Sequence, residues 1–150
     1  MFFGSHQHTI DDKGRLTLPA RWRSELAGGV VVTRGIDDCL FIFPKTKFEE
    51  IAREIDLQGI ERADSRAWSR YFLGMAADAE SDKQGRILIP QNLRDLAKLD
   101  GEVVVVGVAS RIEVWSPDRH KETNAKIESN VEALAERVAQ VMKRAADGSK

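Results

Sequence analysis

The side chains best suited to chemistry in this 150-residue chain are aspartates and arginines that recur in one motif at two places. Residues 11–19 read Asp-Asp-Lys-Gly-Arg-Leu-Thr-Leu-Pro, and residues 82–90, 71 positions later, read Asp-Lys-Gln-Gly-Arg-Ile-Leu-Ile-Pro. A guanidinium can grip a phosphate or the major-groove edge of guanine through two hydrogen bonds. Arg15 and Arg86 are therefore candidate contacts, with Asp11 and Asp82 as positioning groups. The fixed period predicts two copies of one supersecondary unit.

One copy of the motif taken alone has a simpler interpretation. The carboxylate and the guanidinium could bond each other and clamp a hairpin across a glycine turn, in which Gly14 or Gly85 takes a positive φ. Because the motif occurs twice in the same context, we favour a shared functional role. The cations nearby are predicted to support that role: Lys13, Lys83, Arg21 and Arg23.

The charge of the chain is unevenly distributed. A net charge of −1 gives no overall attraction to nucleic acid. From Lys13 to Arg34, however, five basic residues stand against a single acid, Glu25. The second copy is less basic, since Asn92 occupies the position of Arg21. We therefore expect the first copy to dominate any contact with phosphates.

Catalytic and metal-binding patterns are weak. His6 and His8 could share a metal on one face of a strand, but no third ligand of the right type stands nearby, so no metal is expected. The common motifs of hydrolases, nucleotide-binding loops and zinc proteases do not occur. We expect no enzymatic activity and no cofactor. The single cysteine, Cys39, excludes an internal disulfide and is expected to be a buried apolar residue.

Length and composition indicate a soluble globular protein, with 42% hydrophobic and 31% charged residues. Each half is small for an independent core, so the halves are expected to share a core or to need neighbouring subunits. No apolar run is long enough to span a membrane, and the start does not resemble a signal peptide. A cytoplasmic protein without membrane contact is the expectation.

Both copies predict the same order of elements: strand, short helix, strand, strand. Alternating polar and apolar residues indicate half-buried strands, and runs of valine indicate further strands. The short loops favour antiparallel hairpins over a parallel sheet. The expected strands are 15–18, 30–33, 39–43, 86–89, 103–106 and 112–115, and the expected helices are 20–26, 45–55, 63–77 and 91–99.

The tail after Pro117 has apolar residues spaced by four and three positions, which is the spacing of a coiled-coil seam. They are Ile127, Val131, Leu134, Val138 and Val141. A helix that packs on its own domain is the favoured interpretation. A seam for a neighbouring subunit is the alternative.

The two motif copies, the Met1-Phe2-x-Gly4 start, Leu73-Gly74 and the ending 112–115 together resemble the MraZ family, to about residue 145. Each half alone would indicate only the wider AbrB-like, swapped-hairpin superfamily. The resemblance implies an α+β fold, a pseudo-symmetric double AbrB-like β-barrel with flanking helices. The implied parts are a first repeat (5–47), a helical connector (48–76), a second repeat (77–120) and a C-terminal helix and tail (121–150).

The resemblance also implies a function. Family members are sequence-specific DNA-binding transcriptional regulators, often repressors, of the promoter of the division and cell-wall gene cluster. They bind short direct repeats as rings, typically octamers, and would associate with the nucleoid. The family's DNA-contacting loops fall here on Asp11 to Arg15 and on Asp82 to Arg86.

A second function class is kept open. AbrB-like folds also occur in antitoxins, in which a tail grips a partner protein. The residues after 117 could serve this purpose, although their pattern is helical and of mixed charge, whereas antitoxin tails are usually disordered and acidic.

Overall fold

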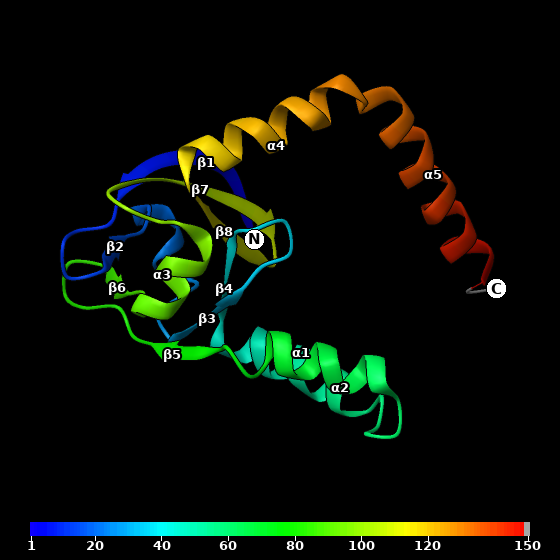
Figure 1. Cartoon of the computed structure of the whole chain (residues 1–150), viewed down its shortest axis with the longest axis horizontal. Coiled ribbons are helices and arrows are strands. Elements are labelled where there is room, and N and C mark those ends of the chain that lie inside the picture. The colour runs from blue at the N-terminus through cyan, green and yellow to red at the C-terminus, as the bar shows by residue number, and fades with distance from the viewer. Residues whose placement is uncertain (149–150) are drawn as a thin grey trace. The chain divides into compact units, whose positions relative to one another are not determined.

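The computed structural model describes residues 1–148, which form an α+β protein of antiparallel sheets and helices (Figure 1). The predicted α+β class is confirmed. Two compact units are present: Met1–Pro117, and a second unit that begins at Asp118. The first unit contains all eight described strands, in a six-stranded sheet of order β1-β7-β8-β4-β3-β5 and a two-stranded sheet of β2 and β6.

The strands agree with the predicted ones except at two places. The chain also pairs at β1 and β5, which the sequence patterns did not indicate as strands, and the other boundaries shift by no more than a few residues. The strands are β1 (Phe2–Thr9), β2 (Arg15–Thr17), β3 (Val30–Arg34), β4 (Leu40–Pro44), β5 (Ala77–Ala79), β6 (Arg86–Leu88), β7 (Glu102–Ala109) and β8 (Arg111–Trp115).

Strand pairing joins the two copies, in addition to the hairpins β3–β4 and β7–β8 within each copy. β1, from the start of the chain, pairs with the valine strand β7 of the second copy, and β5 pairs in the same way with the valine strand β3 of the first copy. In the small sheet, Leu16 faces Ile87, which occupies the same position in its own copy. The two halves therefore share one core, as their small size predicts.

That shared core lies on one side of the six-stranded sheet. Alternate residues of the central strands point into it, such as Val30 and Val32 on β3 and Leu40 and Ile42 on β4. Leu16 and Ile87 meet them from the small sheet. Side chains alternate between the two faces of a strand, so each three-residue strand of the small sheet points one side chain, Leu16 or Ile87, into the core. That side chain is fully buried, which fixes the short strand in place.

A second apolar cluster covers the other face of the sheet. Helices α1 (Lys45–Asp56) and α2 (Ala63–Phe72) bring Phe48 and Phe72 against Phe41 and Phe43 of β4. The rings of Phe43 and Phe72 meet edge to face at 6.0 Å between centroids. The buried hydroxyl of Thr33 donates a 2.6 Å hydrogen bond to the carbonyl of Phe72, which attaches the end of α2 to the sheet.

Three helical predictions need correction. The segment predicted as a helix over 20–26 forms only the 3-10 helix η1 (Ala20–Trp22), followed by turns. The helix predicted over 63–77 ends at Phe72, because the residues from Ala77 pair with β3 instead. Helix α3 (Gln91–Ala97) stops two residues before the predicted end, at Lys98 in the left-handed conformation.

The second unit consists of helices, described here by themselves. α4 (Pro117–Ser129) and α5 (Val131–Gly148) are separated at Asn130, so the predicted seam is not one continuous helix. The seam residues of α5 are exposed: Val131, Leu134, Val138 and Val141. Within residues 1–148, no helix is long and apolar enough to cross a membrane.

Within the residues that the structure describes, the six-stranded sheet is open and does not close on itself. β1 and β5 lie at its two ends, and no ladder joins them within the described residues. The closed double barrel that the resemblance implies therefore stays a prediction.

Candidate nucleic-acid interface

The first motif folds into a tight loop held by one carboxylate. Asp11 Oδ1 accepts hydrogen bonds from the backbone N–H groups of Lys13 (3.0 Å) and Arg15 (2.9 Å), and Oδ2 accepts one from Arg15 Nε at 2.7 Å. Gly14, at φ +84°, donates its N–H to the Asp11 carbonyl. The aspartate thus fixes both the turn and the guanidinium.

The second motif repeats this geometry. Asp82 Oδ1 accepts from the N–H groups of Gln84 and Arg86, both at 2.9 Å, and Oδ2 accepts from Arg86 Nε at 2.8 Å. Gly85 takes φ +74° and donates to the Asp82 carbonyl. Two loops of different middle residues, Asp12-Lys13 against Lys83-Gln84, therefore present their arginines identically.

These hydrogen bonds lower the pKa of both carboxyl groups. For Asp11 the main cause is the backbone N–H of Arg15, followed by the side chain of Arg15 and the N–H of Lys13. For Asp82 it is the backbone N–H of Arg86, followed by the equivalent groups. Both aspartates are therefore anionic at neutral pH, and they act as acceptors that aim an arginine rather than as acids.

The arginines keep donors free for a ligand. Within residues 1–148, the side-chain hydrogen bonds of Arg15 and Arg86 use Nε, which leaves both terminal nitrogens of each guanidinium available. Their side chains are 33% and 26% exposed. The motif can therefore be both a clamp and an anion contact. The clamp uses the Nε of each guanidinium, and the two terminal nitrogens remain available for a ligand.

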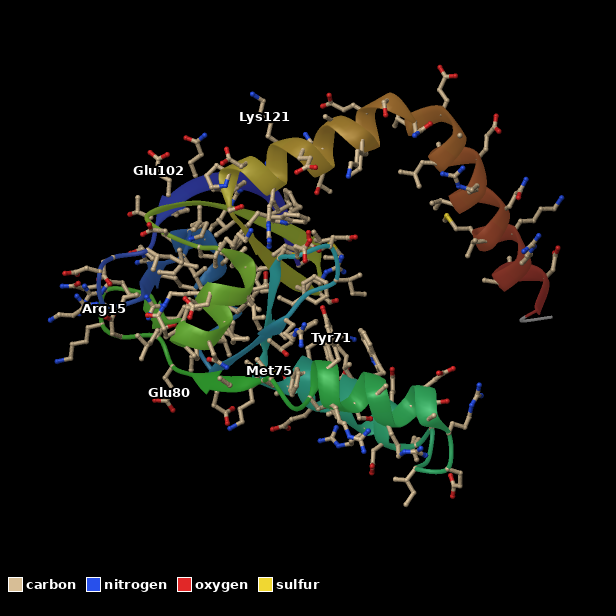
Figure 2. The ribbon with its side chains drawn as sticks, viewed as in Figure 1. Arg15, Tyr71, Met75, Glu80, Glu102 and Lys121 are labelled. Carbon is tan, nitrogen blue, oxygen red and sulfur yellow. The ribbon has the colours of Figure 1, made fainter. Side chains whose placement is uncertain are left out.

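Both arginines lie on the same face of the β2–β6 ribbon. Arg15 pairs with Leu88 and Arg86 with Thr17, on either side of the inward-facing Leu16–Ile87 pair. Diagonal neighbours of this kind have Cα atoms roughly 7–8 Å apart. Figure 2 shows Arg15 at the edge of the first unit where the two loops meet, on the side opposite α1 and α2.

Each glycine turn is covered by an arginine from the other copy. A Cβ on Gly14 would lie 2.7 Å from Arg94 Cζ, and a Cβ on Gly85 would meet the guanidinium of Arg23. Arg94 Nε donates to the Ile89 carbonyl at 2.9 Å, and Arg23 Nη2 donates to the Leu18 carbonyl at 3.4 Å. The sequence shows that both arginines follow a proline by four residues, but not that they cross between the copies.

The remaining predicted residues surround the ribbon. Lys13 and Lys83 are exposed beside the two arginines, and Arg21 and Arg23 are exposed at η1. Sequence reasoning missed Leu88, which is 56% exposed on the same outward face as Arg15. The sequence did contain a signal for this residue, because a leucine stands at an outward position of a strand predicted to be half-buried.

The other chemically suggestive groups are two histidines and one cysteine. His6 and His8 lie on one side of β1 with ring centroids 6.4 Å apart, and in the described part of the chain no three His, Cys, Asp or Glu residues form a group that could hold a metal. Cys39 is buried, as expected, and burial raises the pKa of its thiol to about 12. That thiol is therefore protonated and inert at neutral pH.

Comparison with known proteins agrees with the two-copy architecture. The family model described as "MraZ protein, putative antitoxin-like" matches twice, at residues 1–71 and 72–142. A protein of Desulforamulus reducens named transcriptional regulator MraZ is 46% identical over 95% of this chain and 100% of its own length. Proteins of the same name from Moorella thermoacetica and Roseiflexus castenholzii are 49% and 44% identical, over 92% and 94% of this chain and 96% and 99% of their own lengths.

The fold, the duplicated loop and these relatives define the class: a transcriptional regulator built from two copies of one α+β unit. The chain belongs to the MraZ family. The resemblance found in the sequence is thereby confirmed, with the period of 71 residues equal to the spacing of the two family matches.

Proposed function

We propose that this protein binds duplex promoter DNA in a sequence-specific manner through the β2–β6 ribbon. The observation that carries the proposal is the pair of arginines on one outward face, each aimed by an aspartate and each with free terminal donors. The major groove of B-DNA is about 12 Å wide and admits a two-stranded β-ribbon. Two arginines spaced by roughly 7–8 Å on such a ribbon fit within that width.

The other loop residues have supporting roles in this proposal. Asp11 and Asp82 position the guanidinium groups, and Gly14 and Gly85 permit the turns. The exposed cations contact the phosphate backbone: Lys13, Lys83, Arg21 and Arg23. Phosphate contacts of this kind fix the orientation of a protein on the duplex, whereas base contacts select the sequence.

The family resemblance extends the proposal to target and assembly. The target is the promoter of the division and cell-wall gene cluster, bound at short direct repeats and repressed, by a nucleoid-associated cytoplasmic protein. The protein binds as a ring, an octamer of double-barrel protomers with repeats at 5–47 and 77–120. A protomer of net charge −1 is a poor DNA ligand by itself, and linked loops on a ring would gain through effective concentration.

A mobility-shift experiment tests this function. The purified protein is mixed with the DNA upstream of its own gene, with a scrambled duplex as competitor, over a series of salt concentrations. We expect binding that the specific duplex alone displaces and that weakens steeply with salt. A folded, oligomeric sample that shows no preference for the upstream duplex would contradict the proposal.

A second candidate is a protein-binding module that acts through the C-terminal helix. The exposed apolar stripe of α5 favours it. If this function is correct, replacing Val138 and Val141 with serine removes a partner protein while DNA binding is retained. Loss of DNA binding in the same variant would instead assign the stripe to the DNA-binding assembly.

A further inference from the structure

The first copy carries a cluster of basic side chains of which the second copy keeps only one, Arg94 at the position of Arg23. His6 and His8 are half-buried on the same side of β1, facing η1. The ring of His6 meets the ring of Trp22 edge-on at 5.3 Å, and its Nε2 contacts Nη2 of Arg21. A Cβ on Gly4 would lie 2.9 Å from Arg21 Nη2, so the glycine makes room for this packing.

The charge of this cluster is not neutralised within the described residues. Arg21 donates to the carbonyl of Phe3 at 3.5 Å, and Arg23 to the carbonyl of Leu18, but neither forms an ion pair with a carboxylate in residues 1–148. The nearby acids have other placements. Glu25 binds the amino group of Met1 at 2.6 Å. Glu102 on β7 stands opposite Thr9, on the other side of the sheet from the histidines.

The cluster adjoins the second loop. The guanidinium of Arg23 packs on Gly85, between Asp82 and Arg86, and its charge also acts on His8. A run of positive side chains therefore extends from β1 through η1 to the β2–β6 ribbon. In the second copy the equivalent positions of His6, His8 and Arg21 are Ala77, Ala79 and Asn92.

We propose that His6 and His8 join Arg21 and Arg23 in one contact surface for the sugar-phosphate backbone of duplex DNA, whose strength increases as His8 takes up a proton. This inference rests on the proposed function. It makes the protein an asymmetric DNA ligand: the side of the ribbon next to β1 makes more phosphate contacts than the side next to β5. An unpaired cluster of cations is the arrangement that a polyanion stabilises most.

The direction of the pH dependence follows from the surroundings of His8. Burial, the charge of His6 and the charge of Arg23 lower the pKa of His8 in the free protein. A nearby phosphate favours the protonated imidazole, so binding takes up protons. Affinity should therefore rise as pH falls through the range in which histidine titrates. Asp11 and Asp82 stay ionised throughout, because their pKa values are lowered from 3.8.

The residues at the equivalent positions of the second copy indicate which substitutions to test. The full-length variant His6→Ala/His8→Ala/Arg21→Asn carries the residues that already stand at the equivalent positions 77, 79 and 92. Fluorescence anisotropy measures its affinity for the upstream duplex and for a scrambled duplex at pH 5.5, 6.5 and 7.5, each over a salt series. Arg53→Asn on α1, which removes an exposed cation far along the chain from the cluster, is the matched control.

For the wild-type protein we expect affinity to increase by about two- to fivefold from pH 7.5 to 5.5, because one ion pair between protonated His8 and a phosphate has about the strength of an exposed ion pair. The triple variant should lose this pH dependence, and the magnitude of its salt slope at pH 5.5 should fall by about 2 or 3, roughly one per lost phosphate contact. Its preference for the upstream duplex should persist. Arg21→Asn alone should lower the slope by about 1 and keep the pH dependence.

The outcomes separate this inference from the proposed function. A wild-type protein that does not prefer the upstream duplex at any pH overturns both. A wild-type protein that binds specifically, together with a triple variant that keeps the wild-type salt slope and pH dependence, overturns the inference alone. Equal losses in the triple variant and in Arg53→Asn would also overturn it, because they would indicate only net charge.

Discussion

Asp11 and Asp82 make the same three side-chain hydrogen bonds although the residues between them and their arginines differ. The strength of the hydrogen bonds by which they hold the loops and the arginines depends on their negative charge. Since the pKa of each is lowered from 3.8 in the folded protein, their contribution to stability is present above about pH 4 and is lost as pH falls through the lower folded pKa.

This predicts the titration of both groups. Carboxyl carbon chemical shifts, followed by NMR while pH is lowered, should give midpoints below 3.8 for Asp11 and Asp82. Because both groups stay ionised from pH 5 to 8, the loops should not change over that range. A midpoint at or above 3.8 for either group would show that its hydrogen bonds do not persist in solution.

Glycine is required in the loops for two reasons, its positive φ and the arginine of the other copy above it. Gly14→Ala and Gly85→Ala should each lower the free energy of unfolding by about 1–2 kcal/mol, the cost of a left-handed conformation for an L-residue. Urea denaturation measures the change. Gly28→Ala is the control, with no atom within 4 Å of the new Cβ, and should stay within about 0.5 kcal/mol. Equal effects at Gly14 and Gly28 would contradict this explanation.

At the scale of the elements, the sequence predicted the local structure of both copies well. The repeated motif, the valine runs and the proline stops placed six of the eight described strands and the order in which they follow. β1 and β5 were missed because each pairs with a strand of the other copy, and no local pattern reveals a long-range partner. The crossing of Arg23 and Arg94 over the glycine turns was missed for the same reason.

The helical hairpin of α1 and α2 is attached to the sheet by one buried polar contact within the aromatic cluster. Thr33→Val keeps the shape of the side chain but leaves the Phe72 carbonyl without its donor. We expect a loss of about 1–3 kcal/mol in the free energy of unfolding and faster hydrogen exchange in α2.

Chemical denaturation and hydrogen exchange check this prediction. Ser69→Ala is a suitable control, since the Ser69 hydroxyl bonds the Ser65 carbonyl within the same helix and is only partly buried. Its effect should remain near 0.5 kcal/mol. A change at Thr33 no larger than that at Ser69 would mean that the hydrogen bond from Thr33 does not contribute to holding α2 on the sheet.

At the scale of the whole molecule, the two arginine loops on one ribbon give a single chain the same arginine geometry twice. Because the net charge is −1, the proposed attraction to DNA would have to come from this local arrangement rather than from a general field. We therefore expect the two outward arginines of the ribbon to determine sequence preference, and the surrounding lysines and the cluster at η1 to determine the salt dependence.

The measurement that tests this account most directly is the affinity of Arg15→Ala, Arg86→Ala and the double variant for the upstream duplex and a scrambled duplex, by fluorescence anisotropy at fixed salt. Native mass spectrometry of the same samples confirms that assembly is unchanged. We expect each single variant to lose about 1–3 kcal/mol of discrimination and the double variant to bind both duplexes equally. A double variant that is folded, assembled like the wild-type protein and still selective for the upstream duplex would contradict the account.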